Sequence, residues 1–187
     1  MRRVISLKEG WNFYQDGQCS QVALPHTWNA VDGQDGGNDY YRGTCRYVRE
    51  LERPAMEPGS QVWLEVKGAA MTAQVSLNGE LLASHQGGYS AFRVNLTEHL
   101  RDRNELSISV DNSDCDSVYP QKADFTFYGG LYREVNLVVV PEAHFDLSYC
   151  GAPGIKVTPE VNLAAGSARV TVETWQTGAG NVTVTLE

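Results

Sequence analysis

The sequence predicts an all-β protein built as a β-sandwich. Several runs alternate apolar and polar residues with a period of two, which is the pattern of strands that bury one face. Asn78-Gly79 lies between two such runs and is a strong two-residue hairpin signal, because both positions tolerate a positive φ. No segment carries a long apolar stripe with the period of a helix. Short strands separated by Gly and Pro turns are typical of sandwiches.

The alternating runs fall in both halves of the chain. Their apolar members are Val62, Leu64 and Val66, then Leu106, Ile108 and Val110, then Val170 and Val172, and finally Val182, Val184 and Leu186. Val75 and Leu82 flank the Asn78-Gly79 turn. The only helical signal covers residues 97–103, where Thr97 is the expected N-cap.

A domain boundary is predicted near Pro141-Glu142. Residues 134–140 have the pattern of a strand that closes a first domain, residues 1–141. Four further strands are expected at residues 144–150, 155–163, 167–175 and 181–187. An immunoglobulin-type sandwich needs roughly seven strands and about 100 residues, so residues 142–187 are expected to be the start of such a domain, truncated inside a strand.

Composition and charge exclude several classes of function. No window approaches the roughly 18 apolar residues of a membrane span, so no membrane partner is expected. Fifteen Lys and Arg stand against 23 Asp and Glu, a net charge of -8, and an acidic chain without a basic stripe is a poor nucleic-acid binder. The N-terminus lacks the apolar core of a signal peptide. We expect a cytoplasmic protein, or a periplasmic or secreted one if a signal has been removed ahead of Met1.

The four cysteines predict neither a metal site nor a disulfide framework. None is spaced as C-x-x-C, and no histidine has a second ligand at zinc spacing. We expect reduced, mostly buried thiols at Cys19, Cys45, Cys115 and Cys150, and neither a metal nor a cofactor. Residues 32–39 resemble a calcium loop only loosely, because the closing glutamate is absent.

Two loops carry the residue types that bind sugars. Carboxylates and amides pair with sugar hydroxyls, and aromatic rings pack on sugar C–H faces. Residues 32–41 and 119–128 combine both types, although each loop alone is equally well interpreted as a polar turn. No motif of a nucleophile elbow, phosphate loop, dinucleotide site or zinc protease is present.

The tryptophans are interpreted as packing residues. Trp63 lies on the polar face of its strand and could stack on a sugar, but cover by a second layer or a neighbouring domain is the favoured interpretation. Trp11 and Trp28 are expected in the core.

Seven short motifs follow one another between residues 24 and 140. They are L-P-H-T-W-N at 24–29, Y-R-G at 41–43 leading into Y-V-R at 47–49, V-S-L-N-G-E at 75–80, H-Q-G-G-Y-S-A-F at 85–92, N-L-T at 95–97, N-E-L at 104–106 leading into V-D-N at 110–112, and D-F-T-F-Y-G-G-L-Y-R-E-V at 124–135. Together and in this order they resemble the N-terminal sugar-binding domain of glycoside hydrolase family 2, the family of β-galactosidases, β-glucuronidases and β-mannosidases. The likeness continues weakly into residues 142–187.

The resemblance implies a jelly-roll β-sandwich, galactose-binding-domain-like, for residues 1–141, followed by a partial immunoglobulin-like sandwich. It implies that the full-length protein is a retaining glycosidase of carbohydrate metabolism, β-galactosidase-like. In this family the two catalytic glutamates belong to a C-terminal TIM barrel, which is absent from these 187 residues. The chain is therefore assigned no catalytic residue and is expected to be inactive alone. The implied partners are a terminal β-linked sugar and the barrel; a homo-oligomer stays open.

The resemblance also assigns two substrate-binding residues. Asp124 matches an aspartate that reaches into the mouth of the barrel's active site and hydrogen-bonds the terminal sugar. Asp39 is a looser match to a second segment near that site. The alternative for Asp124 is a carboxylate that fixes its own loop. For the chain as a whole, an independent carbohydrate-binding module and a purely structural sandwich remain alternatives. Galactose is the first choice of sugar, before glucuronate and mannose.

Overall fold

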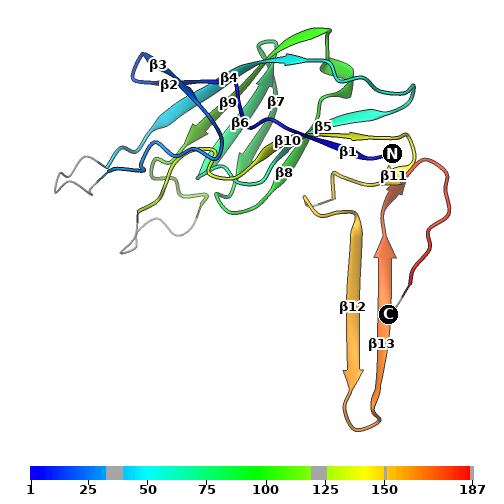
Figure 1. Cartoon of the computed structure of the whole chain (residues 1–187). Coiled ribbons are helices and arrows are strands. Elements are labelled where there is room, and N and C mark those ends of the chain that lie inside the picture. Colours follow the sequence, from blue (N-terminus) through cyan, green and yellow to red (C-terminus); the bar gives the residue numbers. More distant parts are fainter. Residues whose placement is uncertain (33–39, 119–125, 150, 186–187) are drawn as a thin grey trace.

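The computed structural model describes residues 1–32, 40–118, 126–149 and 151–185. Two antiparallel sheets pack face to face as a jelly-roll sandwich (Figure 1), which confirms the predicted fold class. The six-stranded sheet has the order β3 (Gln18–Val22), β2 (Trp11–Gln15), β4 (Thr44–Glu52), β9 (Arg103–Asp111), β6 (Thr72–Leu77) and β7 (Glu80–Gln86). The four-stranded sheet has the order β1 (Arg3–Ser6), β10 (Val135–Val140), β5 (Gln61–Val66) and β8 (Phe92–Asn95).

The core lies between the two sheets and is filled by the inward positions of their strands. Leu106, Ile108 and Val110 of β9 are all fully buried, as their spacing predicts. They share one cluster with Leu64 of the opposite sheet and with Trp11, whose ring meets Tyr47 edge-on. Burying such a side chain contributes about 1.5–3 kcal/mol, so this cluster holds the two sheets together.

The Asn78-Gly79 turn is confirmed. It joins β6 to β7, with φ of 54° at Asn78 and 83° at Gly79. The Asn78 side chain also donates to Asn104 Oδ1 at 3.0 Å and accepts from the Glu105 amide at 3.1 Å. The turn residue therefore ties its hairpin to β9.

The predicted helical turn at residues 97–103 is shorter than expected, and Thr97 is not its cap. Only the 3₁₀ turn η1 (Thr97–His99) forms, and Leu96 occupies the N-cap position. The Thr97 hydroxyl instead accepts a hydrogen bond from the Val62 amide at 3.0 Å. The Thr97 hydroxyl oxygen, expected from the sequence to cap a helix, therefore bonds to the backbone of β5 instead.

Residues after 141 form two short pairs, β11 (His144–Phe145) with β14 (Gln176–Thr177), and β12 (Ile155–Asn162) with β13 (Ser167–Thr174). The predictions for 155–163 and 167–175 hold, whereas the strand expected at 144–150 is only two residues long. No strand forms over residues 181–185, and 186–187 lie outside the described residues. A strand needs a hydrogen-bonded neighbour, and none of the described residues pairs with 181–185.

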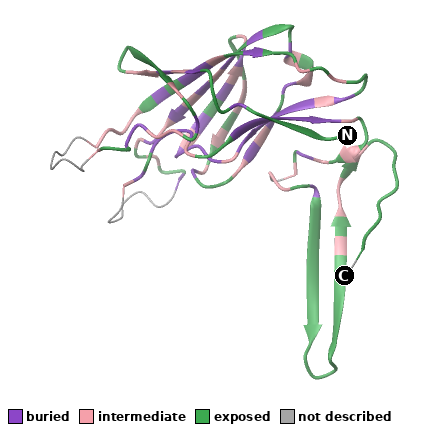
Figure 2. Ribbon diagram, in the orientation of Figure 1, coloured by how far each residue is buried: buried purple, intermediate pink, exposed green. Residues whose placement is uncertain are grey.

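The β12–β13 hairpin has two chemically different faces. Val157 is paired with Val172 and Pro159 with Val170 on one face, while Lys156 forms an ion pair with Glu173 on the other. Figure 2 shows the hairpin exposed over nearly its whole length, in contrast to the strands of the sandwich. The domain boundary near residue 141 stays a prediction.

The described cysteines are free thiols, but they are not mostly buried. Cys45 is buried, Cys115 is half-buried and Cys19 is exposed, because Cys19 lies on the edge strand β3. Cys150 lies outside the described residues. In the part of the chain that the structure covers, no helix has the length and apolar character needed to cross a bilayer.

Candidate functional site

The two loops with sugar-binding residue types meet at one end of the sandwich. The Tyr40 hydroxyl, at the end of the first loop, donates to the Phe127 carbonyl, at the end of the second, at 2.6 Å. Burial raises the pKa of Tyr40, which keeps this hydroxyl protonated as a donor. Asp39 and Asp124 themselves lie outside the described residues, so both assignments stay predictions.

Asp32 closes the first loop. Its Oδ2 accepts from Asn29 Nδ2 at 2.5 Å and from the Tyr41 amide at 3.0 Å. Asn29 Nδ2 also donates to the Tyr41 carbonyl at 2.8 Å. One oxygen of this acidic loop is therefore used to hold its two ends together.

Arg42 is a charged residue whose role the sequence did not reveal. Its Nε donates to the Asn112 carbonyl at 2.7 Å, and Nη1 pairs with Asp114 at 2.6 Å. The guanidinium lies 5.9 Å from the ring centre of Tyr40 and 5.4 Å from that of Phe127, within cation–π range. Arg42 thus holds the aromatic residues at the ends of both loops against one cation. The only available signal was its place in the Tyr41-Arg42-Gly43 motif.

A small cavity of about 110 Å³ opens beside these loop ends. Its walls include Met71, Val118 and Phe127, and the rings of Tyr89, Tyr128 and Tyr132. Tyr89 is 59% exposed and Tyr128 is 45% exposed, whereas the Tyr132 hydroxyl is already bonded to the Gly88 carbonyl. Exposed tyrosines beside a pocket suit the C–H face of a sugar or another planar group.

Trp63 is not part of this site. It is 8% exposed and packs with Val138, Val140 and Leu147, and its indole nitrogen donates to Gln61 at 2.9 Å. The interpretation that a second layer or a neighbouring domain covers it is confirmed, and the sugar-platform alternative is wrong. Trp11 and Trp28 are buried in the core, as expected.

The acidic residues that the structure describes form no metal site. Among residues 1–32, 40–118, 126–149 and 151–185, no three His, Cys, Asp or Glu side chains cluster as ligands. The loose calcium pattern at 32–39 falls mainly outside those ranges, and Asp32 is used by Asn29 and Tyr41. The described geometry therefore provides polar and aromatic surface at the loop end, without a metal centre.

Comparison with known proteins agrees with this geometry. An FMN-binding β-glucuronidase from Facaelibacterium prausnitzii L2-6 is 49% identical and superposes with a TM-score of 0.87, over 95% of this chain and 28% of that one. A β-glucuronidase of Bacteroides fragilis is 32% identical over 86% of this chain and 24% of its own length. A β-galactosidase of Thermoanaerobacter pseudethanolicus is 25% identical over 74% of this chain and 19% of its own length.

The chain spans about a quarter of the length of these relatives. A family model described as glycosyl hydrolase 2 galactose-binding domain-like matches residues 39–148, more than half of the chain. The matched range includes both loop ends, Arg42 and the tyrosine-lined cavity. The chain belongs to the glycosyl hydrolase 2 galactose-binding domain-like family.

Proposed function

We propose that this chain is the N-terminal, non-catalytic part of a retaining β-glycosidase, and that its loop end forms one wall of the sugar site. The observation that carries the proposal is the junction of the two loops, where Tyr40 bonds to the Phe127 carbonyl beside the tyrosine-lined cavity. Family membership and the names of the relatives support the reaction class. Retention needs two carboxyl groups about 5–5.5 Å apart, and we place that pair in a barrel outside these 187 residues.

The first substrate to test is a β-glucuronide. The sequence motifs alone put galactose first, but the compared protein at 49% identity is a β-glucuronidase, whereas those at 32% identity include both a β-glucuronidase and a putative β-galactosidase. A β-galactoside is the second choice.

Residues 142–187 are proposed to begin an immunoglobulin-like sandwich whose other strands come from the same polypeptide. The support is the β12–β13 hairpin, which presents Val157, Val161 and Val170 to solvent on one face. Adding about 60 further residues of the natural polypeptide supplies the roughly 100 that such a domain needs. Hydrogen exchange should then show new protection at Val170 and Val172, whose amides face the free side of β13. Unchanged exchange at both positions would contradict this assignment.

The reaction class is tested with nitrophenyl glucuronide, galactoside and mannoside. We expect the full-length protein to hydrolyse one of them and this chain alone to release nothing above buffer. Turnover by the chain alone that survives repurification would overturn the proposal. Free sugar should bind the chain with millimolar affinity or weaker, because about −4 kcal/mol already corresponds to millimolar binding and one wall supplies few buried contacts.

The exposed Tyr89 and Tyr128 favour one other function, an independent carbohydrate-binding module. Micromolar binding of a sugar by the chain alone, abolished in Tyr128→Ala, would support that function in place of the enzyme part.

Asp124 is proposed to hydrogen-bond the terminal sugar. A hydrogen bond to a charged group contributes about 1.5–3 kcal/mol, so Asp124→Ala should lower kcat/KM of the full-length protein roughly ten- to a hundredfold. The loss should shrink for a substrate that lacks the contacted hydroxyl. Asp102→Ala is the matched control, since Asp102 is an exposed aspartate at the other end of the sandwich. If Asp124 only fixes its own loop, its substitution lowers the melting temperature and leaves the kinetics unchanged.

A further inference from the structure

We propose that Asn29 and Asn112 are positioning residues whose bonded amides hold the ends of both loops as a single unit. Both side chains belong to fully buried residues, yet asparagine is rarely found at such positions. They come from segments 83 residues apart and are bonded to each other, Asn112 Nδ2 to Asn29 Oδ1 at 3.2 Å. A positioning role for the sugar wall rests on the proposed function; the coupling between the loops does not.

Asn112 follows directly after β9 and contacts the ends of both loops. Its side-chain nitrogen Nδ2 lies 3.3 Å from the Tyr41 carbonyl and 3.1 Å from the Phe127 carbonyl. Its Oδ1 accepts from the Gly43 amide at 2.9 Å. One side chain thus bonds to the first loop where it returns to β4 and to the second loop where it returns toward β10.

Asn29 repeats the arrangement from the other side. Its Nδ2 bonds to Asp32 at 2.5 Å and to the Tyr41 carbonyl at 2.8 Å, within the first loop. Its Oδ1 accepts from the Gly129 amide at 2.7 Å, in the second loop. The backbone at Gly129 lies so close to Asn112 that no side chain fits at this position, since a Cβ on Gly129 would lie 2.8 Å from Asn112 Nδ2.

Every donor and acceptor of this pair is used, which makes the pair cooperative. A buried amide that loses its partner costs free energy, because no water replaces the lost bond. Removing the Asn112 side chain leaves the Tyr41 and Phe127 carbonyls with fewer donors and leaves Asn29 Oδ1 with Gly129 alone. The loops should therefore loosen together and not one at a time.

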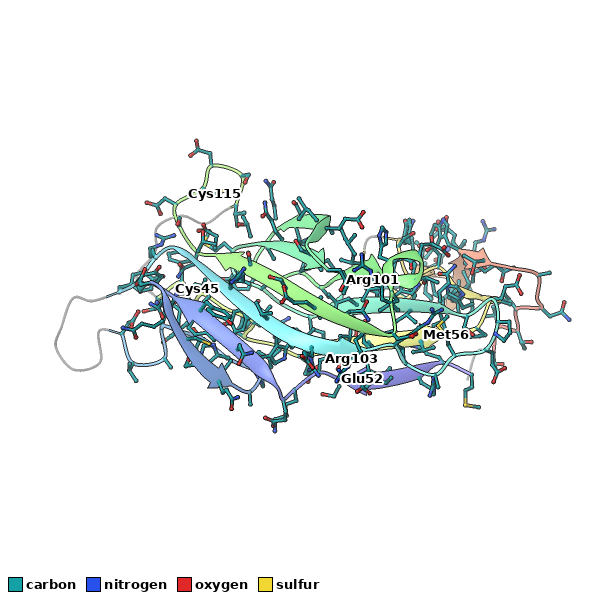
Figure 3. The ribbon with its side chains drawn as sticks, turned by 90° about the horizontal axis from the view of Figure 1, so that it is seen from above. Cys45, Glu52, Met56, Arg101, Arg103 and Cys115 are labelled. Carbon is teal, nitrogen blue, oxygen red and sulfur yellow. The ribbon has the colours of Figure 1, made fainter. Side chains whose placement is uncertain are left out.

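The chain offers a matched control at the opposite end of the same strand. Asn104 is also a buried asparagine, and its Nδ2 donates to the Leu51 and Arg101 carbonyls at 3.1 and 2.8 Å. Its Oδ1 accepts from the Arg101 amide at 2.8 Å. Figure 3 shows Arg101 and Arg103 toward one end of the sandwich and Cys45 and Cys115 toward the other. Asn104→Ala removes a comparable set of bonds about 26 Å away along β9.

Amide hydrogen exchange on the present chain tests the coupling. In Asn112→Ala, the Gly129 amide, which bonds to Asn29 and not to Asn112, should exchange at least tenfold faster. In Asn29→Ala, the Gly43 amide, which bonds to Asn112, should do the same. Asn104→Ala should expose the Arg101 amide and leave Gly43 and Gly129 unchanged. Faster exchange confined to the amide that lost its own acceptor would overturn the coupling.

A second substitution keeps the test decisive if an alanine variant does not fold. Asn112→Ser retains a hydroxyl donor in the space that the asparagine amide leaves. It should give a smaller increase of the Gly129 exchange rate than Asn112→Asp. The aspartate would direct an oxygen at the Tyr41 and Phe127 carbonyls. An aspartate variant as protected as the wild type would contradict the assignment.

Kinetics of the full-length protein test the positioning role. At a temperature well below the melting temperature of the variant, Asn112→Ala should lower kcat/KM about tenfold. Asn104→Ala should stay within twofold of the wild type. Combined with Asp124→Ala, Asn112→Ala should add less than twofold. If Asp124→Ala alone has no effect, the proposed sugar contact of Asp124 fails, and the exchange experiment still decides the coupling. If Asp124→Ala lowers kcat/KM but Asn112→Ala behaves like Asn104→Ala, the positioning role is refuted.

Discussion

Arg93→Ala is expected to destabilise the chain by about 3–5 kcal/mol, because it leaves a buried carboxylate without its partner. Arg93 on β8 faces Glu65 on β5, and both side chains are 9% exposed. The guanidinium Nε and Nη2 each lie 2.8 Å from Glu65 Oε1. Such a pair contributes little net stability when intact. Removing one member leaves the other as a buried charge without a partner, and its desolvation is then not compensated.

The Arg93 guanidinium also connects the sandwich to the segment beyond residue 141. Its Nη1 donates to the Ala152 carbonyl at 2.8 Å and to the Leu147 carbonyl at 3.3 Å. The substitution removes these bonds as well. For domains of 150–250 residues, each kcal/mol shifts Tm by about 2–4 °C, so the expected fall in Tm is roughly 6–20 °C.

Calorimetry and urea unfolding of the wild type and the variant measure this loss. Lys67→Ala is the control, because Lys67 and Glu134 form an ion pair at 2.5 Å whose side chains are 45% and 58% exposed. That exposed pair should contribute less than about 1 kcal/mol. The double variant Glu65→Leu/Arg93→Met should recover most of the loss, since it leaves no unpaired charge. The reasoning is refuted if Arg93→Ala is no more destabilising than Lys67→Ala.

Three further predictions concern stability. Burial lowers the pKa of His26, so below about pH 6.5 the unfolded chain binds a proton before the folded chain does, and the free energy of unfolding should fall as the pH falls. The urea midpoint should therefore be lower at about pH 5.5 than at about pH 7.5, and this difference should shrink in His26→Asn. A difference in His26→Asn equal to that of the wild type would exclude His26 as its source. Gly129→Ala should cost about 1–3 kcal/mol or more in urea unfolding, because its Cβ would lie 2.0 Å from Trp28 Cζ2; a neutral variant would show that the loop can shift. Leu147→Ala should cost about 2–5 kcal/mol by removing the cover of Trp63, and an unchanged urea midpoint would contradict that packing.

Local sequence patterns were sufficient to predict the sandwich. The alternation along β9 gave the inward set correctly because, among the described residues, no further layer covers its outer face, and Asn78-Gly79 fixed a turn by backbone geometry alone. Along β5 the same alternation put Trp63 and Glu65 on the polar face; both are buried, which was expected for Trp63 and not predicted for Glu65. Leu147 packs on Trp63, and Arg93 bonds to Glu65. Both covering residues lie far from β5 in the sequence, so the local pattern could not reveal them.

The site was predictable only in part. The sequence indicated both loops through their residue types, and the structure joins their described ends through Tyr40 and Phe127. The motifs at 24–29, 41–43 and 110–112 contain Asn29, Arg42 and Asn112, but they gave no sign of the contacts that these residues make, since a buried asparagine and an exposed one look alike in a sequence. Such bonds depend on which segments the fold brings together.

Pro159 in the β12–β13 hairpin restricts how the sheet can grow. It is paired with Val170 in the middle of β12, and proline has no N–H to donate to a neighbouring strand. Within sheets, proline is confined to edge strands, with the missing donor turned outward. We therefore expect β12 to remain the outer edge of its sheet, so that any additional strand pairs with the free side of β13. The same residue makes the outer side of β12 a poor template for the edge-to-edge pairing through which exposed hairpins aggregate.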